Sequence, residues 1–194
     1  AADRERAAQA GRAWQILSQG LSVKKYPLCY CTHRAIDGML DLLRAQQVHG
    51  EDVKSITVST SRRNATILRN QQPQTGLEAK FSMQFAMACA LLRGRVGLAD
   101  LDDAFVASDA VQSMFARVRF THLPPNADGT PPRADRVVIT THDGRVLDSG
   151  ELARAKPHTR LKEKFLDCCE AGGFKRGDAQ DLYAITDEGV LRAA

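Results

Sequence analysis

The sequence has no apolar run long enough to cross a bilayer and no signature of a nucleotide site. Its longest apolar stretch, 81–92, contains Ser82 and Gln84 and is shorter than the ~20 residues that a membrane span needs. Its glycines form no phosphate-binding loop, and no internal repeat is visible. These absences argue against a helical membrane protein and against a nucleotide-dependent enzyme. Since the charged start of the chain does not resemble a signal peptide, we expect a cytoplasmic protein.

The cysteines follow no regular spacing. The five cysteines are an odd number, and Cys168 and Cys169 are adjacent, a geometry that strains a disulfide. The alternation of Cys29, Cys31 and His33 resembles a metal cluster. However, a zinc site needs a further ligand pair such as Cys-x-x-Cys, and the sequence has none. We therefore expect reduced thiols, no metal site and no iron–sulfur cluster.

Charge is nearly balanced along the chain and is not clustered. The 194 residues include 27 lysines and arginines against 23 aspartates and glutamates, a formal net charge of +4. The nearest approach to a basic run, Arg62-Arg63, has no interleaved aromatic residues, which argues against nucleic-acid binding. Hydrophobic residues make up 43% of the chain, enough for the core of an ordinary globular domain. A mild positive charge is equally compatible with a small anionic substrate.

Apolar periodicity predicts several helices. In 32–47, apolar residues recur every three or four positions and share one face, as on a helix that packs against a sheet. Residues 75–92 open with Thr75-Gly76-Leu77-Glu78, the pattern of a capping box, and then carry apolar groups on all sides. This pattern predicts a helix buried at the centre of the domain, with Phe81 and Phe85 in the core. Further helices are predicted for 3–18, 99–106, 110–115, 161–172 and 178–185.

Alternation of β-branched and polar residues predicts the strands. Residues 53–60 alternate, which places Val53 on the same side as Ser55 and Ile56 on the opposite side. The other strand signals cover 117–122, 136–141 and, after an Asp143-Gly144 hairpin turn, 145–148. Irregular structure is predicted for the polar stretch 61–74 and for a proline-rich surface loop, 123–133.

The order of these elements predicts the fold class. A strand, a group of helices, a strand pair and further helices do not alternate as the elements of a doubly wound α/β protein do. We therefore expect an α+β fold with a single domain over 1–194. It should be a two-layer sandwich in which helices cover a mostly antiparallel sheet.

Three features of the sequence resemble the C-terminal domain of the MmgE/PrpD family. The first is Lys24-Lys25-Tyr26-Pro27-Leu28-Cys29, followed by His33, and the most specific is Glu78-Ala79-Lys80-Phe81-Ser82. The third is the strand pair followed by Gly150 and by Lys164-Phe165. The resemblance extends from about Trp14 to Cys168. It implies a lyase or isomerase of small di- or tricarboxylates, and a 2-methylcitrate dehydratase-like reaction is the first expectation.

The resemblance also implies partners for this chain. Family enzymes have an all-helical N-terminal domain, to which nothing in this sequence corresponds, and their active site lies at the junction of the two domains. We therefore expect this chain to be the C-terminal lid of a longer, homodimeric enzyme with a small carboxylic acid as its substrate. The common chemistry is proton abstraction next to a carboxylate, which needs a base, an acid and cationic groups but no redox cofactor.

Individual residues receive roles from the same resemblance. Lys24 matches a family lysine that meets substrate carboxylates, where its charge would also stabilise an enolate-like intermediate. His33 is a candidate general acid or base, although a histidine at a helix start is as often a cap. Cys29 occupies a position at which the decarboxylases carry histidine, so decarboxylation is disfavoured. The predicted catalytic residues are Lys24 and His33, and the predicted substrate-binding residues are Lys25, Tyr26, Cys29, Lys80 and Ser82.

Two other functions are compatible with the sequence. A non-catalytic interaction or regulatory domain that keeps the family fold would have the same mild charge and the same exposed proline-rich loop. A nucleic-acid-binding α+β domain is supported only by the basic balance of the chain. The enzyme hypothesis accounts for more of the sequence, because it uses both of the specific segments.

Overall fold

The structure is a computed structural model that describes residues 23–130, Pro132, 134–153 and 161–192, together with Gly11, Trp14 and Leu17. The helix predicted for 3–18 therefore lies outside the described residues, apart from those three positions.

Within the described residues, the strands form a mixed four-stranded sheet of order β2-β1-β3-β4. The strands are β1 (Val53–Thr60), β2 (Val118–His122), β3 (Arg136–Thr141) and β4 (Val146–Asp148). The pairing of β1 with β2 is parallel, whereas β1 with β3 and β3 with β4 are antiparallel. The sheet is thus mostly antiparallel, as predicted. The two strands expected to form a pair, β2 and β3, instead lie on opposite sides of β1.

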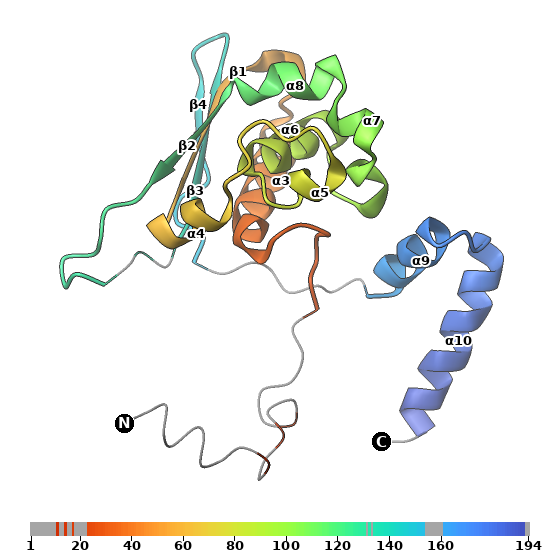
Figure 1. The fold of residues 1–194 in the computed structure, drawn as a ribbon. Coiled ribbons are helices and arrows are strands. Elements are labelled where there is room, and N and C mark those ends of the chain that lie inside the picture. Colours follow the sequence, from red (N-terminus) through yellow and green to blue (C-terminus); the bar gives the residue numbers. More distant parts are fainter. Residues whose placement is uncertain are drawn as a thin grey trace.

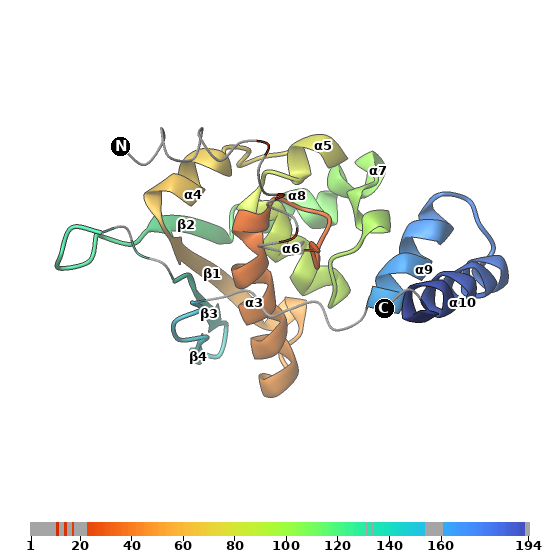
Figure 2. The ribbon, with the colours of Figure 1, turned by 90° about the horizontal axis from the view of Figure 1, so that it is seen from below.

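Helices form a layer on one face of this sheet. The helices of the described residues are α3 (His33–Gln46), α4 (Arg62–Ile67), α5 (Gly76–Ala79), α6 (Met83–Arg93), α7 (Asp103–Val106), α8 (Asp109–Phe115), α9 (Leu161–Ala171) and α10 (Arg176–Arg192), of which α9 and α10 lie outside this layer (Figure 1). Figures 1 and 2 show α3, α6 and α8 beside the sheet, where α3 packs on β3 and α6 on β2. Side chains on the other face, such as those of Thr57 and Thr140, remain half exposed. The predicted α+β class is confirmed.

The core lies between these two layers and draws on both. Fully buried apolar side chains come from α3 (Ile36, Met39), α6 (Met83, Phe85, Met87) and the sheet (Ile56, Val58, Ile139). Every residue of α6 from Met83 to Leu91 is buried, which confirms the predicted central helix. A helix that is apolar on all sides has to be surrounded by other elements in this way.

Val53 lies on the face opposite to the one predicted. The register of β1 against β3 shifts between Val53 and Ser55, so Lys54 is the extra residue of a β-bulge. As a result, Val53 is fully buried on the same side as Ile56. Strict alternation fails here because one unpaired residue moves the preceding side chain to the other face.

The buried helix predicted for 75–92 is in fact two helices. Ser82 has an extended backbone, and its hydroxyl accepts a hydrogen bond from the Phe85 N–H at 3.1 Å, which starts α6 as a new helix. The carbonyl of Lys80 accepts a hydrogen bond from the N–H of Cys29 at 2.8 Å. The break therefore gives the segment before α3 a backbone partner.

The two phenylalanines of this region differ in burial. Phe85 is fully buried and makes an edge-on contact with Phe105, with 6.3 Å between the ring centroids. Phe81 was predicted to be in the core, but 41% of its surface is exposed. The prediction was wrong because Phe81 lies in the break between α5 and α6 and not on a continuous helix.

The ends of α5 and α6 are capped largely as expected. The Thr75 hydroxyl accepts a hydrogen bond from the Glu78 N–H at 3.3 Å. The Glu78 carboxylate accepts from the N–H of Gln74 at 2.7 Å, one residue before the position that a capping box requires. Gly94 ends α6 with a φ of 62°, and its N–H donates to the Ala90 carbonyl at 3.0 Å.

Other elements differ from the predictions mainly in their ends. Helix α4 occurs inside the polar stretch expected to be irregular, and the Ser61 hydroxyl caps it by accepting from the Asn64 N–H at 3.2 Å. The helix predicted for 99–106 is a 3-10 turn, η3 (Leu98–Leu101), followed by α7. Helices α8 and α9 agree with the predictions, and α10 extends beyond the predicted 178–185 at both ends. The described part of the proline-rich loop is largely exposed.

The last two helices pack on each other beside the helical layer. The Phe165 and Tyr183 rings meet at 5.4 Å between centroids and join α9 to α10, while α9 contacts η3. Figures 1 and 2 show this pair away from the sheet. Across the described residues, no helix combines the length and the apolar character that a membrane span demands.

Candidate functional site

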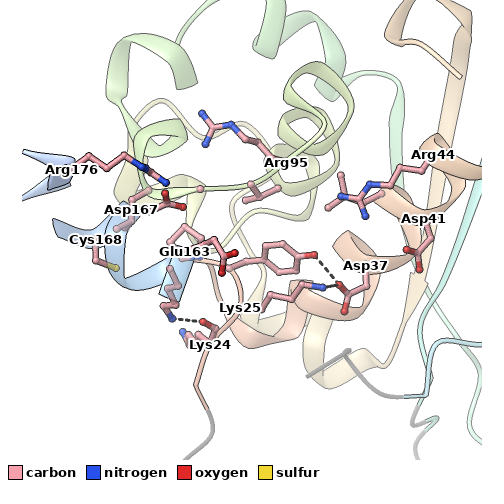
Figure 3. Close-up of a pocket in the computed structure, with 17 residues that line it drawn as sticks. Lys24, Lys25, Asp37, Asp41, Arg44, Arg95, Glu163, Asp167, Cys168 and Arg176 are labelled. Carbon is pink, nitrogen blue, oxygen red and sulfur yellow. Dashed lines mark hydrogen bonds and ion pairs between the residues drawn. The ribbon is translucent and has the colours of Figure 1, made fainter. Parts of the chain in front are cut away.

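A cavity of about 810 Å³ lies where the segment before α3, helix α3, the loop after α6 and the α9–α10 pair meet (Figure 3). Its lining is rich in charge. The cationic residues are Lys24, Lys25, Arg44, Arg95, Lys164 and Arg176, and the anionic residues are Asp37, Asp41, Glu163 and Asp167. Cationic groups are therefore in excess, which suits a ligand of negative charge.

A second cavity of about 290 Å³ has a different character. Glutamines dominate its lining, and none of the described residues around it is charged: Gln71, Gln72, Gln84, Gln112, Phe115, Ala116 and Val118. The larger cavity is therefore the better candidate for binding a carboxylic acid. We refer to it below as the charged cavity.

Lys24 is exposed at the edge of the charged cavity. Its ammonium group donates a hydrogen bond to the Leu28 carbonyl at 3.1 Å, and its own carbonyl accepts one from the Lys164 ammonium group of α9. The Leu28 side chain is 1% exposed and anchors this segment in the core. Pro27 lacks an N–H and disfavours a helical conformation for the residue before it, so the segment stays non-helical until η1 (Tyr30–Thr32).

Lys25 and Tyr26 also line the charged cavity, but both are bound to Asp37 of α3. The Tyr26 hydroxyl donates to the Asp37 carboxylate at 2.8 Å, and the Lys25 ammonium group forms an ion pair with the same oxygen. Burial, followed by the hydrogen bond to Asp37, holds the pKa of Tyr26 well above its usual range. Two of the predicted substrate-binding residues thus have a partner within the protein.

His33 lies beneath this segment and does not line the charged cavity. It is 1% exposed, and its ring packs against those of Tyr26 and Tyr30, with centroid distances of 5.2 and 4.7 Å. Burial lowers the pKa of His33 to about 4, against the opposing effect of hydrogen bonding to the Leu28 backbone and with a contribution from the charge of Lys24. The imidazole is neutral at pH 7, and its Nε2 has no hydrogen-bond partner among the described residues.

The remaining predicted substrate-binding residues lie apart from the charged cavity. Cys29 is half-buried and is joined to Lys80 through the backbone hydrogen bond described above. Ser82 is fully buried and caps α6.

Burial, and then the neighbouring Cys29, raise the pKa of Cys31 to about 11, so this thiol stays protonated at neutral pH. In the part of the chain that the structure describes, no three His, Cys, Asp or Glu side chains gather as a metal site would require.

Several charged residues of the cavity were not predicted from the sequence. Asp37, Asp41 and Arg44 follow one another at steps of four and three residues, which places them on one face of α3. These residues lie away from the apolar face of the helix, and only the position of α9 and of the preceding segment makes them part of a cavity wall. Arg95 enters from the loop after α6, where its guanidinium group lies 3.5 Å from the buried carboxylate of Asp100.

Comparison with known proteins identifies the family. The family model described as the MmgE/PrpD C-terminal domain matches residues 26–183, which is most of the chain. No curated protein gave a match. The chain therefore belongs to the MmgE/PrpD family and corresponds to its C-terminal domain.

Proposed function

We propose that this MmgE/PrpD C-terminal domain binds a small di- or tricarboxylate in the charged cavity and takes part in a cytoplasmic lyase or isomerase reaction. Dehydration of a 2-methylcitrate-like substrate is the first candidate. The observation that carries the proposal is the excess of cationic groups around a cavity of about 810 Å³. A cavity of that size is in the range that holds small-molecule substrates.

Lys24 is the residue with the strongest support for a catalytic role. It is exposed at the cavity, and its ammonium group is held near the Leu28 carbonyl by a hydrogen bond. Removal of a proton next to a carboxylate produces an enolate-like species, and a fixed positive charge lowers the energy of that species. Lys24 would therefore bind a substrate carboxylate and stabilise the intermediate.

His33 is our proposed proton donor or acceptor. Its low pKa keeps it neutral near pH 7, so its Nε2, which has no hydrogen-bond partner among the described residues, is free to accept a proton. Tyr26 and Tyr30 cover the ring, so proton transfer with substrate would require this cover to open. Because the proposed chemistry is proton transfer assisted by cationic groups, we expect it to need no metal or other cofactor. Loss of turnover on chelation, with recovery on addition of a metal, would contradict that expectation.

The direct test of the site is Lys24→Ala in the native polypeptide. We expect turnover of 2-methylcitrate to fall by about 10²- to 10³-fold, the usual cost of removing one group that stabilises a developing negative charge. Lys54→Ala is the matched control, because Lys54 is an exposed lysine that does not line the cavity. Wild-type turnover in Lys24→Ala would contradict the assignment.

We further propose that an all-helical N-terminal domain completes the active site and that the whole enzyme is a homodimer. An antibody against this chain, used on an immunoblot of the source cells, tests the first part. A band larger than expected for 194 residues supports a longer enzyme. A band at that size supports a domain that functions alone.

A non-catalytic binding domain is the second candidate function. Two observations favour it: His33 is buried, and the charge of Lys25 is compensated by Asp37. A native polypeptide that binds citrate but turns over no di- or tricarboxylate would support this alternative over the enzyme.

A further inference from the structure

One carboxylate, that of Asp37, ties the segment before α3 to the helix itself. Its Oδ1 atom accepts a hydrogen bond from the Tyr26 hydroxyl at 2.8 Å and forms an ion pair with the Lys25 ammonium group. Figure 3 shows the Lys25 side chain directed at Asp37 on the cavity wall. Two consecutive residues of the segment are therefore held at the same atom.

These groups are largely buried, so the charge of Asp37 depends on partners within the protein. The Asp37 side chain is only 4% exposed and that of Lys25 is 29% exposed, while Tyr26 is 6% exposed. A carboxylate with so little access to water needs partners to compensate its charge, and loss of the Tyr26 or the Lys25 donor weakens that compensation. The contact is therefore a strong constraint on the path of the chain.

This contact makes the two adjacent lysines differ in how their charges are compensated. Lys25 faces a buried carboxylate, so its charge is compensated within the protein. Lys24 is exposed, and its ammonium group donates to the neutral carbonyl of Leu28 at 3.1 Å. The residue fixed by Asp37 is thus the one that directly follows the proposed substrate ligand.

We propose that Asp37 is a positioning residue for Lys24: it clamps Lys25 and Tyr26 to α3 and so holds the Lys24 ammonium group at the charged cavity. This inference rests on the proposed function and deepens it. It gives Lys25 and Tyr26 a different role from the one that the family resemblance suggested. They hold the segment in place, and Lys24 meets the substrate.

Kinetics of the native polypeptide separate positioning from binding. Asp37→Asn and Lys25→Met should each lower kcat by up to about 100-fold, as expected when a reacting group is slightly misplaced, with a smaller change in KM. Because both changes break one contact, the double variant should lose little more than the worse single variant. A lysine that bound substrate directly would instead raise KM. Asp109→Asn, at an exposed aspartate of α8, is the matched control and should keep wild-type kcat.

A second measurement, by NMR, reports on the position of Lys24 and does not depend on catalytic activity. Reductive methylation with ¹³C-formaldehyde keeps the lysine charge and gives each lysine an NMR signal, and Lys24→Arg assigns the signal of interest. The Lys24 signal should shift in Asp37→Asn and remain unchanged in Asp109→Asn. If Asp37→Asn does not fold, Tyr26→Phe removes a single bond of the same clamp and should shift the signal in the same direction.

The outcomes are distinguishable. Lower kcat together with a shifted Lys24 signal supports the proposal. Unchanged kcat, or an unchanged Lys24 signal, in folded Asp37→Asn overturns it. If the wild-type protein turns over no di- or tricarboxylate, the proposed function fails, and the Lys24 signal still decides whether Asp37 holds that lysine.

Discussion

The two segments that resemble the family most closely have different roles in the structure. Residues 24–29 place charged side chains at the charged cavity. Residues 78–86, the more specific in sequence, end α5 and begin α6, and among the residues described none of this run lines that cavity. The backbone hydrogen bond from the Cys29 N–H to the Lys80 carbonyl joins the two segments.

This difference shows that a distinctive sequence can reflect folding as much as chemistry. The run 78–86 needs a hydroxyl at Ser82 to start a helix and an apolar ring at Phe85 to fill the core. Both requirements concern the fold and not the chemistry. The role of each residue in a family motif is therefore best assigned from the contacts of its side chain.

The largest predicted effect tests whether the second segment is structural. Phe85→Ala should lower the free energy of unfolding by about 3–5 kcal/mol, because it removes a fully buried ring and leaves a cavity. Phe81→Ala in the same run is the control and should cost much less, since Phe81 is 41% exposed. Urea unfolding measures both. Equal losses in the two variants would place Phe81 in the core after all.

A smaller effect concerns His33 and pH. Its pKa is about 4 in the folded protein against 6.5 in an ordinary environment, so below pH 6.5 the unfolded chain binds a proton that the folded chain does not. The contribution of His33 to the free energy of unfolding should therefore be fully present above pH 6.5. It should fall by up to about 3 kcal/mol as the pH decreases toward 4, and it should not change further below that pH. His33→Gln should weaken this dependence. An identical pH profile in His33→Gln would contradict the buried, neutral state.

The smallest effect separates the two roles suggested for Ser82. As the cap of α6, Ser82→Ala should lower the free energy of unfolding by about 1 kcal/mol and leave KM unchanged. Denaturation and steady-state kinetics on the native polypeptide check the two values. A raised KM with unchanged stability would instead support the substrate-binding role predicted from the family.

Local patterns predicted much of the fold. Helix α3, strand β1 and the buried α6 agree with the periodicity of their residues, because each pattern depends on neighbours within a few positions. The parallel pairing of β1 with β2 and the bulge at Lys54 were not predictable in this way. Both depend on contacts between residues far apart in the sequence.

The candidate site was predicted less completely. The family resemblance named Lys24 and Lys25, and both line the charged cavity, but it assigned Lys25 to the substrate and gave no role to Asp37. The ion pair between Lys25 and Asp37 joins the segment before α3 to a residue of α3 that lies 12 positions later, so spacing alone does not reveal it. The break at Ser82 had a signal, since serine is a preferred cap, but the apolar pattern on both sides of it obscured that signal.

The most direct test of the central claim is calorimetric titration of the native polypeptide with citrate. We predict binding by the wild type and by Lys54→Ala, and at least about tenfold weaker binding by Lys24→Ala, because a lost charge-assisted contact costs about 1.5–3 kcal/mol. Equal affinity in all three proteins would contradict the assignment of the charged cavity beside Lys24 as the carboxylate site.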